Sequence, residues 1–247
     1  MASSRELASL GEAWNKLAQE DPLWAILVEP HARHGGWNRD EFYATGVQEV
    51  TASLALAERL GMLASGQRAL DFGCAAGRLT RALAASFELV TGVDIAPEML
   101  AIAQQDNPVA SKCEFVLNTK PDLTLFGDAE FDLVYSSIVL QHMPPELSRE
   151  YLAEFARVLR PGGSLIVHLP STPRHTLRGL AFRYLPPRAL GVVQQRLLGY
   201  PAPMQMHGIP EPIVRRELTG HGLEVLTVET TAFGQDWHER RYFCRKV

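Results

Sequence analysis

The spacing of apolar residues changes in character near residue 68. Before it, Leu7, Leu10, Trp14 and Leu17 recur at helical spacing, and a second helical repeat follows at Val47, Val50, Leu54 and Ala57. After it, short apolar runs alternate with helical segments, which is typical of βαβ units. The pattern predicts an α/β fold, with a doubly wound, seven-stranded, mostly parallel sheet, helices on both faces and an N-terminal helical cap.

The individual elements follow from the same pattern. Seven strands are expected, at 68–72, 89–94, 113–117, 131–136, 163–169, 223–229 and 240–246. Four helices are expected between them, at 77–86, 97–105, 145–159 and 210–221. We expect residues 1–64 to form the cap and 65–247 the main domain, with an insert at 171–210 after the fifth strand.

Composition narrows the class of protein. With 247 residues, 46% of them hydrophobic and 21% charged, the chain suits one α/β domain that carries a cap. No apolar run approaches the ~18 residues of a membrane span, and no secretory signal is readable, so a cytoplasmic protein is expected. Three distant cysteines show no metal-site spacing and are expected to be reduced thiols, with no metal bound.

The charge of the chain is unevenly distributed. A formal net charge of −4 argues against a strongly basic nucleic-acid binder. The insert 171–210, however, holds five arginines and no acidic residue. It is interpreted foremost as a lid over an acidic or phosphate-bearing substrate. An interfacial helix on anionic lipid, a dimer contact and a solvated surface hairpin stay open as alternatives.

A candidate ligand loop follows the first predicted strand. The segment from Ala69 to Arg78 places an apolar strand, a turn of small residues and a helix in succession. Glycine permits close backbone approach to a ligand, and the helix start presents free N–H groups. Asp94 ends the next strand about twenty positions later, where a carboxylate of a doubly wound fold accepts ribose hydroxyls. This spacing suits both adenosine cofactors and dinucleotides.

Four segments in a fixed order narrow the function of the ligand loop. They are LDFGCAAGRLTRALA, VTGVDIAPEML, FDLVYSSIVLQHMPP and RVLRPGGSLIVHLP, which together span residues 70 to 170. In this order they resemble the signature segments of class I S-adenosylmethionine (SAM)-dependent methyltransferases. The resemblance implies SAM as cofactor and S-adenosylhomocysteine (SAH) as product. It also implies in-line transfer of a methyl group to an oxygen, nitrogen or carbon of a small-molecule acceptor.

The resemblance also implies roles for individual residues. Asp71 matches the acidic position that holds the methionine amino group, and Asp94 matches the ribose carboxylate. The loop around the amino-acid part and ribose matches Gly73, Cys74, Ala75 and Gly77. Positions beside the adenine match Ile95, Met99, Asn118 and Thr119, and the loop near the sulfonium runs from Ser136 to Val139.

Two positions depart from the family pattern. Ala75 stands where a glycine is usual, and its methyl group narrows the permitted backbone angles, so the alanine is tolerable if its φ is negative. Ala96 stands where Ser or Thr commonly caps the next helix, and such a missing cap typically costs about 1 kcal/mol.

Candidates for the acceptor side are fewer. His142 follows the fourth strand at the substrate edge of the sheet and is the candidate general base. Packing against the loop is its alternative role. Trp37, Tyr43 and His207 are expected to bound the acceptor pocket, although such aromatic residues are more often part of a core.

Two other functions stay open at this point. An NAD(P)-dependent oxidoreductase shares the strand, glycine loop and acidic residue, but residues 73–77 do not give G-x-G-x-x-G. A non-catalytic SAM-binding protein would keep Asp71 and Asp94 without turnover. The sequence identifies neither the acceptor nor the choice between monomer and homodimer.

Overall fold

The computed structural model describes residues 2–105, 107–231 and 234–247. Its sheet has seven strands in the order β3-β2-β1-β4-β5-β7-β6, and β7 alone runs antiparallel to its neighbours β5 and β6. The strands are β1 (Gly66–Phe72), β2 (Phe87–Asp94), β3 (Cys113–Leu117), β4 (Phe131–Ser136), β5 (Leu159–Pro173), β6 (Leu223–Thr230) and β7 (Trp237–Lys246). The predicted fold class is confirmed.

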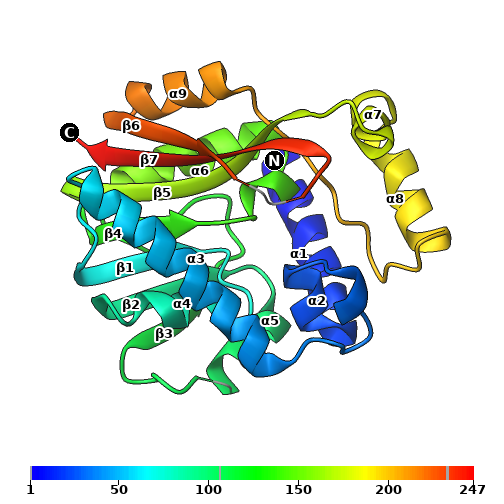
Figure 1. The fold of residues 1–247 in the computed structure, drawn as a ribbon, viewed down its shortest axis with the longest axis horizontal. Helices are drawn as coiled ribbons and strands as arrows, with labels where there is room; N and C mark the ends of the chain where they lie inside the picture. Colours follow the sequence, from blue (N-terminus) through cyan, green and yellow to red (C-terminus); the bar gives the residue numbers. More distant parts are fainter. Residues whose placement is uncertain (1, 106, 232–233) are drawn as a thin grey trace.

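Helices connect the strands and cover the sheet (Figure 1). The α-helices are α1 (Ala2–Glu20), α2 (Pro22–Ile26), α3 (Arg39–Arg59), α4 (Arg78–Leu83), α5 (Pro97–Gln105), α6 (Pro145–Val158), α7 (Leu177–Tyr184), α8 (Pro187–Arg196) and α9 (Glu211–Gly220). Two short 3-10 helices are η1 (Pro30–Ala32) and η2 (Leu140–His142). None of the helices in the described residues is long and apolar enough to cross a membrane.

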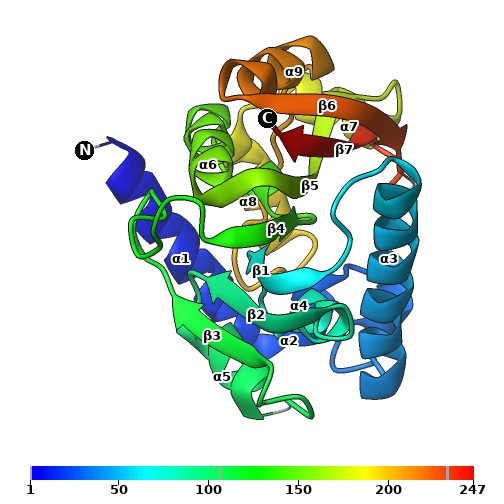
Figure 2. The ribbon, with the colours of Figure 1, turned by 90° about the vertical axis from the view of Figure 1, so that its left-hand side faces the viewer.

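Each face of the sheet is covered by a different pair of helices (Figure 2). On one face, α6 and α9 pack their apolar stripes against the sheet, through residues such as Leu152, Phe155 and Val214. On the other face, α3 packs on α4, and its Val50 and Leu54 join a second buried cluster. The helix α3 therefore shares a core with the sheet.

The remaining helices gather at one end of the sheet. In Figure 1, α1, α2, α7 and α8 lie on the right, beyond the ends of the parallel strands. The strand order reverses between β1 and β4, which are neighbours in the sheet although β2 and β3 come between them in sequence. Open α/β sheets bind ligands outside the carboxyl ends of the strands at such a reversal. The fold thus places the candidate site under α1.

Candidate functional site

A cavity of about 840 Å³, part of it open to solvent, lies at the carboxyl ends of β1, β2 and β4. Its wall combines the ligand loop after β1, the loop after β4 and the inner side of α1. The lining residues are Leu7, Leu10, Trp14, Ile26, Phe72, Gly73, Cys74, Ala75, Arg78, Leu79, Val93, Asp94, Ile95, Met99, Asn118, Ser137, Ile138, Val139, His142, Met143 and Tyr151. Most of them are apolar, with a few polar groups that converge from different elements.

The loop after β1 depends on its backbone conformation. Gly73 has a φ of 76°, and a Cβ there would overlap the side chain of Val139 from the loop after β4. Ala75 has a φ of 45°, so the condition of a negative φ is not met. Its N–H donates to Asp94 Oδ2 at 2.8 Å, and this bond holds the left-handed turn in place. The loop bends because Asp94 fixes it from the neighbouring strand.

Asp94 retains acceptor capacity toward the cavity. Its Oδ1 accepts the N–H of Ala96 and its Oδ2 that of Ala75, both at 2.8 Å. A carboxylate offers about four acceptor positions, so each oxygen keeps one for a ligand. Burial raises the pKa of Asp94, while backbone donors at Ala96, Ala75 and Ile95 favour its charged form. Two adjacent hydroxyls would satisfy it, as the diol of a ribose provides.

The expected adenine positions divide into two groups. Ile95 and Met99 line the cavity, and Met99 is buried. Asn118 also lines the cavity, but its side chain donates to the Asp122 carbonyl at 2.7 Å and accepts from Lys120 N–H at 3.0 Å. Thr119 is exposed and lies outside the lining. Asn118 therefore shapes the wall, and its amide keeps one N–H and one lone pair.

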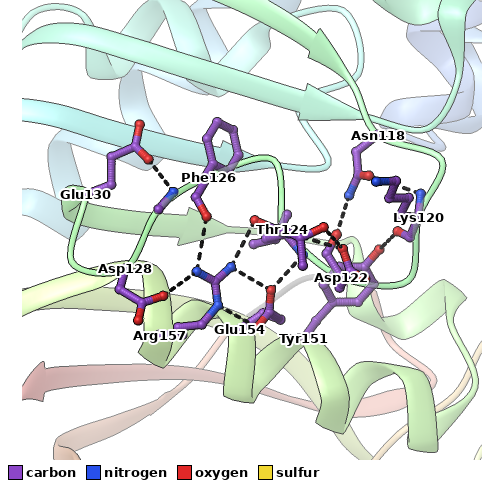
Figure 3. A network of polar contacts seen from close by, with 12 residues as sticks. Asn118, Lys120, Asp122, Thr124, Phe126, Asp128, Glu130, Tyr151, Glu154 and Arg157 are labelled. Carbon is purple, nitrogen blue, oxygen red and sulfur yellow. Dashed lines mark hydrogen bonds and ion pairs between the residues drawn. The ribbon is translucent and has the colours of Figure 1, made fainter.

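A polar network on α6 holds the loop after β3 in place (Figure 3). Arg157 donates to the carbonyls of Leu123 and Phe126 at 2.9 and 3.1 Å, and to Glu154. Glu154 in turn accepts the N–H of Leu123 at 2.7 Å. The Tyr151 hydroxyl donates to the Lys120 carbonyl at 2.8 Å, while the Tyr151 side chain borders the cavity. The network thus fixes the loop that begins at Asn118.

Two predicted cofactor residues lie behind the cavity wall. Asp71 is 1% exposed and accepts the Thr80 hydroxyl at 2.6 Å, and burial raises its pKa to about 7. The Ser136 hydroxyl donates to the Phe72 carbonyl at 3.1 Å. Neither residue belongs to the lining, whereas Val139, at the other end of that loop, does.

His142 lies at the rim where α1 meets the loop after β4. Its ring meets Trp14 edge to face at 4.9 Å, and its Nδ1 lies 2.7 Å from the Gln205 carbonyl. A carbonyl only accepts, so Nδ1 carries the proton and Nε2 keeps a lone pair. Nε2 lies 3.2 Å from the Gln141 amide nitrogen. Burial lowers the pKa of His142 to about 4, which keeps the imidazole neutral at neutral pH.

The three expected acceptor-pocket residues lie elsewhere. The Trp37 indole donates to the Leu27 carbonyl at 3.1 Å, and the Tyr43 hydroxyl donates to the Ala76 carbonyl at 3.3 Å. Neither lines the cavity. His207 borders a second hollow of about 630 Å³ beneath α7 and α8. Its backbone N–H donates to the Gln141 carbonyl at 2.7 Å, which places this hollow beside the His142 rim.

Sequence reasoning missed a buried acid that organises the wall. Glu49 of α3 accepts from Arg78 at 2.9 Å, from Arg241 at 2.8 Å and from the Ser137 hydroxyl at 2.6 Å. Arg78 and Ser137 both line the cavity. The two arginines lower the pKa of Glu49 although burial opposes them. In the sequence, Glu49 looks like any polar residue of an amphipathic helix, so only tertiary contacts identify it.

Trp14 was also missed as a site residue. The apolar spacing of α1 predicts a helix that packs on a core. The structure shows that the apolar face of α1, including Trp14, covers the cavity. No cluster of metal-ligating side chains occurs in residues 2–105, 107–231 and 234–247.

Comparisons with known proteins agree with this geometry. A family model described as a methyltransferase domain matches residues 70–167. An uncharacterized methyltransferase of Synechocystis is 37% identical over 44% of this chain and 51% of its own length. The demethylmenaquinone methyltransferase of Tropheryma whipplei is 31% identical over 66% of this chain and 68% of its own. The match thus spans about half of the first relative and two thirds of the second.

Solved structures share the fold over nearly the whole chain. Magnesium protoporphyrin IX methyltransferase of Synechocystis, solved with bound SAH, superposes with a TM-score of 0.66 at 21% identity. The superposition covers 98% of this chain and 100% of that one.

Proposed function

The chain belongs to the SAM-dependent methyltransferase family, and we propose that it methylates a small, largely apolar acceptor within the cavity under α1. Its cofactor is SAM, and the match to a methyltransferase model replaces the oxidoreductase alternative. The observation that carries the proposal is Asp94, which keeps one free acceptor position on each oxygen at the end of β2.

The cofactor side uses groups that the fold has already positioned. Asp94 receives the two ribose hydroxyls, and the Gly73 to Gly77 loop follows the rest of the nucleoside and amino-acid part. Ile95 and Met99 provide an apolar wall for the adenine, as expected for a flat aromatic ring. Asp71 lies behind this wall, so we assign it an indirect role through the loop and Thr80.

Positioning dominates the proposed reaction. Bound SAM supplies a methyl group on a positively charged sulfur. The thioether that remains is neutral, so it needs no proton in order to leave. Ser137, Ile138 and Val139 border the inner part of the cavity, and Trp14 and Met143 hold an apolar acceptor against it. Such walls exclude water and align donor and acceptor.

His142 is the proposed proton acceptor. Its Nδ1–H is engaged by the Gln205 carbonyl, so Nε2 is the basic atom, and it lies beside the cavity. An imidazole with a pKa of about 4 is a weak base. It therefore suits an acceptor hydroxyl that is already acidic, such as a phenol or enol, better than an ordinary alcohol.

The cap and the insert have complementary proposed roles. We propose that α1, within the cap 1–64, closes the cofactor cavity through Leu7, Leu10 and Trp14. The insert 171–210 covers the second hollow through Phe182 and Leu190, beside the His142 rim.

The test measures SAH release with phenolic, enolic, alcoholic and amine acceptors. Turnover is expected with an acidic hydroxyl, and His142→Gln is expected to lower it about tenfold to a thousandfold with SAM affinity unchanged. His221→Gln, the same substitution at an exposed histidine after α9 and outside the cavity lining, serves as the matched control. Full turnover in His142→Gln would contradict the base role, and no SAH with any small acceptor would contradict the proposed acceptor class.

A further inference from the structure

The outer surface of α7 and α8 concentrates the exposed apolar side chains of the molecule. Thirteen large hydrophobic residues are exposed among the described residues, and eight of them lie in 177–198. Leu177 is 90% exposed, Leu197 78% and Tyr184 71%. The others in this segment are Leu180, Leu185, Val192, Val193 and Leu198. Such a cluster marks an interaction surface.

The inner surface of the same two helices is anchored to the domain. Phe182 packs on Trp237 with ring centroids 5.6 Å apart. The Gln194 side chain both donates to and accepts from the backbone of Met204, at 2.9 Å each. Thr176 caps α7 by accepting the N–H of Gly179 at 2.9 Å. The exposed side chains therefore project from a fixed platform, which lies at the right-hand edge of Figure 1.

Positive charge surrounds these apolar side chains. Arg178, Arg183, Arg188 and Arg196 are exposed, and none of them forms an ion pair within residues 2–105, 107–231 and 234–247. No acidic residue occurs anywhere in 171–210. Apolar side chains beside exposed arginines, on short helices, are the composition of an interfacial membrane-binding surface.

Charge argues against a second copy of the chain as the occupant. A twofold contact would place the same patch on both subunits, so arginines would face arginines. A surface of anionic lipids instead offers opposite charge together with an apolar interior.

We propose that the outer face of α7 and α8 docks the protein on membranes that contain anionic phospholipid. Leu177, Tyr184 and Leu197 enter the headgroup and acyl boundary, and the four arginines contact lipid phosphates. Docking concerns this surface alone and does not depend on which acceptor is methylated.

The experiment measures co-sedimentation of the full chain with two kinds of vesicle, phosphatidylcholine alone and phosphatidylcholine mixed with phosphatidylglycerol. Binding is expected only to the mixed vesicles, and it should weaken as salt is raised. Arg183→Gln/Arg188→Gln is expected to reduce the partition coefficient about fivefold for each charge removed. Leu177→Ser/Leu197→Ser should reduce it at least tenfold, because both apolar anchors are lost.

Matched controls remove the same residue types elsewhere. Arg5→Gln/Arg59→Gln and Val47→Ser/Leu117→Ser change exposed residues outside the insert and should bind as the unchanged protein does. Unfolding temperatures of all variants verify that each is folded. The proposal would be overturned if the control variants lost as much vesicle binding as the insert variants, or if the unchanged protein did not bind the mixed vesicles. Self-association that the insert variants abolish, without vesicle binding, would identify a homodimer contact instead.

Discussion

The carboxylate of Asp94 must be charged to accept hydroxyls on both oxygens. Because burial raises its pKa, protonation begins at a higher pH than for an ordinary aspartate. SAM affinity is therefore expected to fall as the pH falls through that raised pKa. Asp94→Asn should weaken SAM binding about tenfold to a hundredfold at neutral pH and flatten this dependence.

Titration calorimetry across the acidic range measures both effects. Glu88→Gln, on the exposed side of the same strand, is the control and should keep the affinity and the pH profile of the unchanged protein. If Asp94→Asn binds SAM as tightly as the unchanged protein, Asp94 does not bind the ribose hydroxyls.

Asp71 couples the stability of the fold to pH. Its pKa is about 7 in the folded protein and near 3.8 when unfolded, so the folded state binds the extra proton between these values. The free energy of unfolding should therefore fall as the pH rises through that window, by about 1.4 kcal/mol per pH unit. Asp71→Asn should remove this slope, because an uncharged amide still accepts the Thr80 hydroxyl.

Urea unfolding at several pH values between 4 and 8 tests this coupling. Asp40→Asn, an exposed acid in the first turn of α3, should retain the slope. A slope that persists in Asp71→Asn would show that another group is its source.

Among whole elements, the strands were the most predictable from the sequence. Both faces of β4 are buried, so its apolar run has sharp limits, and its predicted bounds 131–136 are those observed. The fifth strand was expected at 163–169 but extends over Leu159–Pro173, because it pairs with β4 from Leu159 and with β7 as far as Pro173. That extension comes from a tertiary partner, which the local pattern does not contain.

In the site, too, local features were predictable from the sequence and tertiary contacts were not. Gly73 and Asp94 act through backbone geometry at fixed spacing, so motif and structure agree on where they lie. The conformation of Ala75 was not predictable, because the bond from Asp94 holds a φ that alanine seldom adopts. Trp37 and Tyr43 lie outside the cavity lining, because aromatic residues near a site in sequence need not face it.

Glu49 of α3 contacts residues of the site, and we expect the loss of its charge to lower the stability of the fold. Glu49→Gln leaves Arg78 and Arg241 facing a neutral amide in a buried position, which should cost about 3–5 kcal/mol of unfolding free energy. SAM affinity should fall as well, since Arg78 and Ser137 line the cavity.

Chemical unfolding and calorimetry of the same samples measure the two quantities. Glu58→Gln, exposed on the same helix, should change stability by less than about 0.5 kcal/mol. A loss of stability with normal SAM affinity would make Glu49 a purely structural residue.

On the scale of the whole molecule, the cavity joins parts that are distant in sequence, from Leu7 of α1 to Tyr151 of α6. A ligand that contacts all of them binds only the folded chain. At a concentration about one hundredfold above its Kd it should add about 2.7 kcal/mol of stability. For a domain of this size, each kcal/mol raises the Tm by about 2–4 °C.

SAH is therefore expected to raise the Tm by about 5–10 °C, which differential scanning fluorimetry measures. NAD at the same concentration should leave the Tm unchanged, because Ala75 stands at the second glycine of G-x-G-x-x-G, where the backbone must approach the pyrophosphate. Trp14→Ala should lose part of the shift, since the α1 wall then closes over the ligand with a smaller side chain. A full shift in Trp14→Ala would mean that the loops after β1, β2 and β4 hold the cofactor without α1, and that α1 acts on the acceptor alone.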